Sequence, residues 1–257
     1  MSPRGEFDPY TIRHARWRKL PIVWTYQRLL SHRFVFHSTC DAETEYIRGQ
    51  FKHPARVIQI PNYLEVPELV ERVPEKYFLF IGRLNFKKGI ENLIEAVALS
   101  KEFASSGFKL KIAGRGESDY TDMLRRKVEE LGLAGKVEFI GQVEGKEKLQ
   151  LFANAHWTFM PSYTENFGMV VLESLAQNTP VLASTNSPWQ ILEDEKVGYW
   201  VDNSPETLGK MIDKIIVMSA DEYEAYRRQG RAFVEKNFDI KNNISRWTDF
   251  YSSLTDK

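Results

Sequence analysis

Six short segments rich in apolar residues alternate along the chain with longer segments that have the apolar spacing of helices. The first of them, Tyr77–Ile81, is a continuous apolar run, as is typical of a strand that is covered on both faces of its sheet. Six strands alternating with helices predict a Rossmann-like α/β fold with an open, doubly wound parallel sheet. The expected strands are Tyr77–Ile81, Lys109–Ala113, Val137–Ile140, Trp157–Met160, Val181–Ala183 and Tyr199–Val201.

The segments between these strands predict the helices that connect them. In open parallel sheets, ligands bind beyond the carboxyl ends of the strands. We therefore expect the functional residues in the loops that follow the first four strands. The expected helices are Ile90–Phe103, Asp119–Leu131, Lys146–Ala153, one that begins after Phe167-Gly168, a short one that begins near Pro188, Pro205–Ser219 and Asp221–Lys236.

The chain divides into three regions: 1–72, 73–239 and 240–257. The middle region holds the six expected strands. The first region ends in a charged linker that contains prolines, and the last region is a helix with one apolar stripe, which we expect to pack back on the first region. The elements expected outside the middle region are a basic helical stretch, the strand Phe34–Ser38, the helix Asp41–Gln50, the strand Arg56–Ile60, the linker Glu65–Pro74 and the helix Ile240–Leu254.

Composition excludes several classes of protein. The chain has 257 residues and a formal net charge of zero, so it carries no overall signature of nucleic-acid binding. A single cysteine, Cys40, excludes an internal disulfide and fits a reducing compartment. No apolar run approaches the length of a membrane span, and the first residues do not form the apolar core of a signal peptide. We therefore expect a cytoplasmic protein.

The zero balance hides a basic segment. From Pro9 to Cys40 the chain has six arginines and lysines and no acidic residue, with tryptophans and tyrosines interleaved. Such a segment, here residues 10–33, can contact an anionic membrane surface. The other interpretation is a partly buried helix with a solvated basic side, because no clean apolar stripe is evident.

The segment Pro161–Glu173 is the strongest indication of function. It reads as the end of a strand, a polar loop with Glu165, and the start of a helix that contains Glu173. A helix N-terminus favours an anion, and Gly168 lets the backbone approach a ligand closely. Carboxylates bind hydroxyls, so the segment favours a ligand that has both phosphates and hydroxyls. The alternative is two solvated surface glutamates.

Three glycine-containing turns follow other strands. In Gly82–Gly89, Arg83 and Lys88 are placed to bind phosphate, although a solvated basic turn is also consistent with the pattern. The ending of a Walker A loop is absent there. Gly114-Arg115-Gly116 is half of a dinucleotide fingerprint and is interpreted as a tight turn. Gly141-Gln142-Val143 is either the edge of a nucleotide-base site or an ordinary turn.

Six motifs therefore occur in order along the expected sheet. Together they resemble the donor domain of family 4 glycosyltransferases, which have the GT-B fold. The resemblance covers roughly residues 57–254. The motifs are Gly82–Gly89, Ile112–Gly116, Phe139–Val143, Pro161–Glu173, Pro180–Ser184 and Val197–Asp202.

The resemblance implies retaining transfer of a sugar from a UDP- or GDP-sugar, without an essential metal or other cofactor. Arg83 and Lys88 match the residues that hold the diphosphate leaving group, and Glu165 matches the carboxylate that faces the sugar hydroxyls. These three are the implied catalytic residues, and Glu173 matches the carboxylate that binds the ribose. The implied donor-binding residues are Gly82, Gly114, Gln142, Val143, Asn166, Phe167, Gly168, Met169, Val170 and Glu173.

A narrower resemblance concerns the pathway. Ser2–Gly5 and Thr185–Trp189 are similar to segments of members that build bacterial surface polysaccharide or lipopolysaccharide. This implies a glycan or a lipid-linked acceptor.

Departures from the family pattern limit what the resemblance implies. Asn186-Ser187 stand where two glycines are usual, and Glu117 replaces a frequent proline. The first 64 residues resemble only the last part of an acceptor domain. We therefore expect the chain to bind the donor but to transfer slowly, or to need a partner chain. The alternatives are a non-catalytic nucleotide-sugar-binding subunit and a dinucleotide-dependent oxidoreductase, which the missing third glycine of the fingerprint disfavours.

Overall fold

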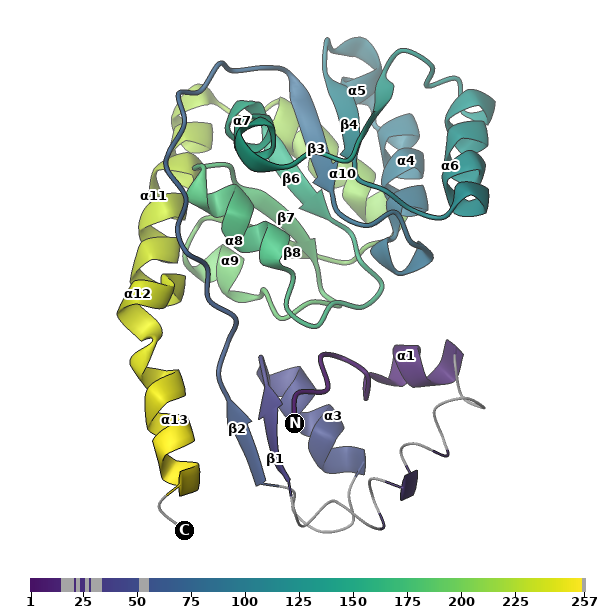
Figure 1. Ribbon diagram of the computed structural model, residues 1–257. Helices are drawn as coiled ribbons and strands as arrows, with labels where there is room; N and C mark the ends of the chain where they lie inside the picture. Colours follow the sequence, from purple (N-terminus) through teal and green to yellow (C-terminus); the bar gives the residue numbers. More distant parts are fainter. Residues whose placement is uncertain (15–20, 22–23, 26–27, 29–33, 51–55, 256–257) are drawn as a thin grey trace.

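The chain folds into a larger and a smaller part, which are joined by two crossing segments (Figure 1). The computed structural model describes residues 1–14, 21, 24–25, 28, 34–50 and 56–255. One crossing segment connects the smaller part to β3 (Tyr77–Ile81), and the other is the run of C-terminal helices. The two segments are hydrogen-bonded to each other. Leu64 donates its N–H to the carbonyl of Phe238 at 2.9 Å, and its carbonyl accepts from the N–H of Ile240 at 3.0 Å.

Among the residues that the structure describes, six strands form the sheet of the larger part. Their order is β5-β4-β3-β6-β7-β8, and every neighbouring pair is parallel. This confirms the predicted open parallel sheet, with β3 and β6 at its centre. The strands are β3 (Tyr77–Ile81), β4 (Lys109–Ala113), β5 (Val137–Gly141), β6 (Trp157–Met160), β7 (Val181–Ser184) and β8 (Gly198–Val201).

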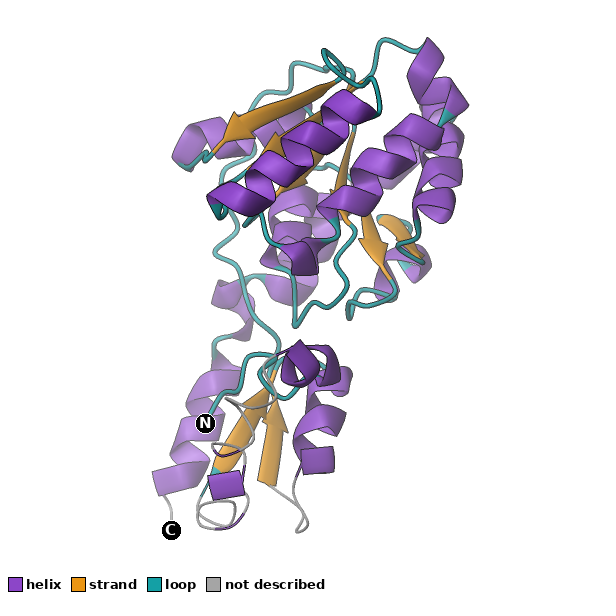
Figure 2. Ribbon diagram, turned by 90° about the vertical axis from the view of Figure 1, so that its right-hand side faces the viewer, coloured by secondary structure: helices purple, strands orange, loops and turns teal. Residues whose placement is uncertain are grey.

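Helices cover both faces of this sheet (Figure 2), as the apolar runs of the strands require. Along β3, Phe78 and Phe80 belong to a core with α4, α6 and α10, whereas Tyr77 and Leu79 pack with Phe152 of α7 on the other face. The helices are α4 (Ile90–Leu99), α5 (Lys101–Ser105), α6 (Ser118–Glu130), α7 (Gly145–Asn154), α8 (Met169–Ala176), α9 (Ile191–Asp194), α10 (Pro205–Ile216) and α11 (Ala220–Phe238).

Several predicted helices differ from those observed, and α10 ends at Ile216, three residues before the predicted end. The first breaks at Ser100, because its hydroxyl accepts the N–H of Phe103 at 3.0 Å and donates to Asp213 at 2.5 Å. The short helix expected near Pro188 begins only at Ile191 as α9. The C-terminal helix is divided into α12 (Ile240–Asn243) and α13 (Ser245–Thr255), with Ile244 between them.

Within its described residues, the smaller part is built on two parallel strands, β1 (Val35–Ser38) and β2 (Arg56–Gln59), and includes the helices α1 (Pro9–His14) and α3 (Asp41–Gln50). The apolar stripe of α13 is only partly covered by it. The ring of Trp247 packs on His37 with centroids 4.7 Å apart, whereas Tyr251 remains 59% exposed. Helix α13 therefore contacts the first region at Trp247 and is exposed at Tyr251.

The basic segment 10–33 is described only in part, because residues 15–20, 22–23, 26–27 and 29–33 lie outside the described residues. Of the described residues, Arg28 places its guanidinium 5.6 Å from the ring of Trp24. Membrane contact through this segment stays a prediction. Among the helices described, none combines the length and the apolar character needed to cross a bilayer.

A half-buried histidine, His156, directly precedes β6. His156 stacks on Tyr223 with centroids 4.1 Å apart and meets Phe108 edge-on at 5.0 Å. Burial lowers the pKa of His156 to about 4, and the positive charges of Arg72 and Arg227 act in the same direction. His156 is therefore neutral in the folded protein at pH 7.

Candidate functional site

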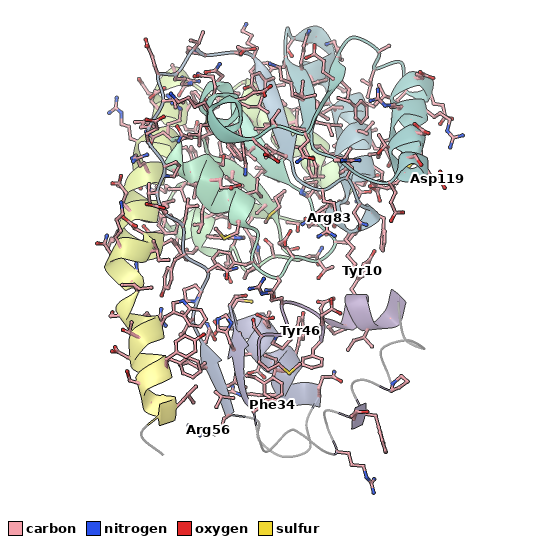
Figure 3. All side chains as sticks on the ribbon, viewed as in Figure 1. Tyr10, Phe34, Tyr46, Arg56, Arg83 and Asp119 are labelled. Atoms are coloured by element: carbon pink, nitrogen blue, oxygen red, sulfur yellow. The ribbon has the colours of Figure 1, made fainter. Side chains whose placement is uncertain are left out.

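A cleft of about 1250 Å³ opens between the two parts, at the carboxyl ends of β3 and β6. Most of the predicted site residues line it. Figure 3 shows Arg83 at the edge of the larger part that faces the smaller part. The lining residues with polar or charged side chains include His37, Thr39, Asn62, Tyr63, Arg83, Lys88, Lys148, Glu165, Asn166 and Glu173.

The turn after β3 presents two cations to this cleft. Leu84 donates its N–H to the carbonyl of Arg115 at 2.9 Å, and Asn85 caps the short 3-10 helix η3 (Phe86–Lys88) by accepting from Lys87 at 3.1 Å. These contacts fix the turn. Among the described residues, the exposed guanidinium of Arg83 has no hydrogen-bond or ion-pair partner, so its donors are available to a ligand.

Lys88 and Glu165 form an ion pair across the cleft wall. Their side chains are 26% and 13% exposed, so the pair is largely withdrawn from solvent. Ser162 donates weakly to the same oxygen, Oε2, at 3.4 Å. Within the described part of the chain, Oε1 of Glu165 accepts no hydrogen bond, which leaves it to bind a hydroxyl.

The start of α8 supplies backbone donors. Gly168 has φ of 83°, and a Cβ there would lie 2.6 Å from the sulfur of Met160, so only glycine fits. In the described structure no side chain caps the helix, so its first N–H groups are available to an anion. Asn166 is fixed to the smaller part, because its Nδ2 donates to Thr39 Oγ1 at 3.1 Å.

Glu173 also faces the cleft, one turn into α8, and is paired with a lysine. Lys148 of α7 donates to Glu173 Oε1 at 2.6 Å. Both side chains are about a quarter exposed and line the cleft. The sequence did not single out Lys148, because only the packing of α7 beside α8 distinguishes it from Lys146, two residues earlier.

Three predicted donor-binding residues are not among those that line the cleft in the described structure: Gly114, Gln142 and Val143. Gly114 has a packing role, because a Cβ there would lie 1.8 Å from the carbonyl oxygen of Gly82. Val143 is buried against Phe152, and Gln142 is exposed and donates to Glu144 at 2.6 Å. Nucleotide-base binding by these residues stays a prediction.

A second cavity, of about 860 Å³, lies on the other side of the loop that carries Glu165. Glu165, Asn166 and Phe167 line both cavities, whereas Gly168 lines only the cleft and Trp189 only the second cavity. The loop is therefore the wall between two solvent-accessible spaces.

Comparison with known proteins places this site in a family. Residues 65–233 match the family described as "Glycosyl transferases group 1". An uncharacterized glycosyltransferase of Methanocaldococcus jannaschii is 38% identical over 144 residues, which are 55% of this chain and 36% of that protein. The O-antigen chain mannosyltransferase RfbU of Salmonella typhimurium is 34% identical over 110 residues, 43% of this chain and 30% of that protein. The chain thus spans about a third of the length of these two relatives.

Solved structures agree on the fold. HepE of Anabaena, solved in complex with UDP and glucose, superposes with a TM-score of 0.82 at 18% identity, over 98% of this chain and 70% of that one. The six-stranded parallel α/β fold thus matches GT-B glycosyltransferase structures. Because the family match extends over more than half of the chain, the protein belongs to the glycosyl transferases group 1 family.

Proposed function

We propose that the cleft binds a nucleotide-diphosphate sugar and that the chain is the donor-binding part of a retaining glycosyltransferase of family 4. The observation that carries this proposal is the arrangement of opposite charges in one cleft. Arg83, Lys88 and the uncapped start of α8 line the same space as Glu165 and Glu173. Cations and N–H groups suit a diphosphate, and the carboxylates suit the hydroxyls of two sugars.

The chemistry follows from these positions. Breaking the bond between the sugar carbon C1 and the diphosphate oxygen leaves negative charge on the phosphate. Preorganised donors stabilise such charge, and Arg83, Lys88 and the N–H groups of α8 are in place before the bond breaks. The acceptor hydroxyl then bonds to C1 on the face that the phosphate leaves, and its proton passes to a phosphate oxygen. Glu165 holds the sugar through its free oxygen.

The donor and the acceptor are proposed from relatives. HepE was solved with UDP and glucose, which makes UDP the first nucleotide to test, and GDP the second. RfbU is an O-antigen chain mannosyltransferase, which favours a glycan or lipid-linked acceptor in surface polysaccharide synthesis. The chain spans about a third of such relatives, so we propose donor binding for it and test transfer to an acceptor as a separate question.

The test is calorimetric titration of the chain with UDP, GDP, ADP and NAD. We expect micromolar binding of UDP or GDP, and a loss of about tenfold or more in Arg83→Met, because one charge-assisted contact contributes about 1.5–3 kcal/mol. Arg115→Met is the matched control, since Arg115 is an exposed arginine at the end of the neighbouring strand and is not among the cleft-lining residues described. Preferential binding of NAD, or equal losses in the two variants, would contradict the proposal.

Slow transfer is tested separately. The chain is incubated with the sugar nucleotide that binds best and with a panel of glycan acceptors, and product is followed by mass spectrometry. Donor binding without turnover would favour a partner-dependent or non-catalytic subunit. Rapid turnover by the chain alone would show that it needs no partner.

A further inference from the structure

Trp189 holds the peptide that begins the proposed diphosphate site. It lies between β7 and α9, is only 2% exposed, and meets the ring of Phe167 edge-on with centroids 5.2 Å apart. Its indole Nε1–H donates to the backbone carbonyl of Phe167. Trp189 lines the second cavity, so its indole approaches the loop that carries Glu165 from the side opposite to the cleft.

The geometry of the peptide group determines where the N–H of Gly168 points once this bond is formed. In a trans peptide, the C=O and the following N–H point to opposite sides. The carbonyl of Phe167 is held toward Trp189, so the N–H of Gly168 points to the side on which Gly168 lines the cleft. Among the residues described, no group accepts a hydrogen bond from this N–H.

A glycine cannot hold this orientation by itself. Gly168 has no side chain and can adopt positive or negative φ with little penalty, so the peptide before it can rotate. A rotated peptide would turn the carbonyl oxygen of Phe167 toward the cleft, where it would repel an anion. The indole bond opposes that rotation, because the rotation would leave the buried Nε1–H of Trp189 without an acceptor, which is costly.

We propose that Trp189 is a positioning residue, which aims the Gly168 N–H at the diphosphate of the donor without touching the donor. This inference rests on the proposed function of the cleft. It predicts that Trp189 affects affinity for the diphosphate and leaves affinity for the nucleoside unchanged, because the ribose-binding Glu173 lies farther along α8.

The test compares Trp189→Phe with wild type by calorimetry, using UDP and uridine, or GDP and guanosine if GDP binds better. We expect the diphosphate to bind about tenfold more weakly, as for the loss of one charge-assisted hydrogen bond, and the nucleoside to bind equally. Trp200→Phe is the matched control, because Trp200 donates the same kind of bond to the carbonyl of Ser187 at 3.0 Å, outside the loop that carries Glu165.

The outcomes distinguish failure of this inference from failure of the proposed function. Failure of wild type to bind any nucleoside diphosphate overturns both. If wild type binds and Trp189→Phe binds UDP equally well, or loses UDP and uridine affinity equally, the positioning role is wrong. If Trp189→Phe does not fold, NMR spectra of the backbone amides of the wild-type chain test the inference instead. The Gly168 amide should shift with UDP and not with uridine, and an unshifted amide contradicts the inference.

Discussion

Replacing Glu165 by glutamine should separate binding of the sugar from binding of the nucleotide. The variant keeps the shape of the side chain but removes its charge. In the structure Oε2 is engaged by Lys88 and Ser162, while Oε1 has no described partner, and Glu165 lines the cleft. The charge is therefore available to one or two sugar hydroxyls.

The magnitude follows from the type of hydrogen bond. A bond to a charged group contributes about 1.5–3 kcal/mol and a neutral one about 0.5–1.5 kcal/mol, so each hydroxyl loses about 1 kcal/mol. For one or two hydroxyls, the UDP-sugar should bind about 5- to 30-fold more weakly. Affinity for UDP itself should not fall, because Glu165 is assigned to the sugar and Lys88 keeps its positive charge for the phosphate.

The assay is calorimetry with UDP and with the UDP-sugar that wild type binds most tightly. Glu173→Gln is the contrasting variant, because loss of a ribose contact should weaken UDP, the UDP-sugar and uridine by the same factor. An equal loss of UDP and UDP-sugar affinity in Glu165→Gln would refute the assignment of Glu165 to the sugar.

Three other predictions concern charge, backbone packing and pH. Lys88→Met should weaken UDP binding about tenfold or more in calorimetry. Lys87→Met makes the same change one residue away, outside the lining described for the cleft, and should change UDP affinity less than about threefold, because about 0.15 M salt screens charges that do not contact the ligand. Equal effects of the two variants would count against a direct contact of Lys88 with UDP. Gly114→Ala would place a Cβ 1.8 Å from a backbone oxygen and should lower the free energy of unfolding by at least about 3 kcal/mol in urea titrations. Gly132→Ala, with φ of 68° and no described atom within 4 Å of its Cβ, should lower it by about 1 kcal/mol. Similar losses in the two variants would show that the close contact with the backbone oxygen is not the cause. The pKa of His156 is lowered to about 4 from 6.5, so the unfolded chain binds more protons than the folded chain between these pH values. The free energy of unfolding should therefore fall by on the order of 3 kcal/mol as the pH drops from 6.5 to 4. Urea titrations should show a smaller fall in His156→Gln, and an identical fall would exclude His156 as the source.

Local pattern predicted the sheet and much of the cleft. The strands with continuous apolar runs were predicted within one residue, because burial on both faces leaves little freedom in their composition. The turn after β3 and the start of α8 were placed correctly because strand ends of a parallel sheet share one edge. Arg83 and Glu165 could therefore be expected to line one space.

Long-range contacts account for what was missed. The helix break at Ser100 depends on Asp213, which is more than a hundred residues away. The pairing of Glu173 with Lys148 depends on how α7 lies beside α8, and the role of Trp189 depends on a carbonyl 22 residues earlier. None of these contacts leaves a periodic pattern in the sequence.

The most direct test of the central claim is a crystal structure of the chain with UDP bound. The diphosphate should lie in the cleft between the guanidinium of Arg83 and the N–H groups at the start of α8, with the ribose hydroxyls on Glu173. A nucleotide seated in the second cavity, or a diphosphate in contact with neither Arg83 nor α8, would contradict the account.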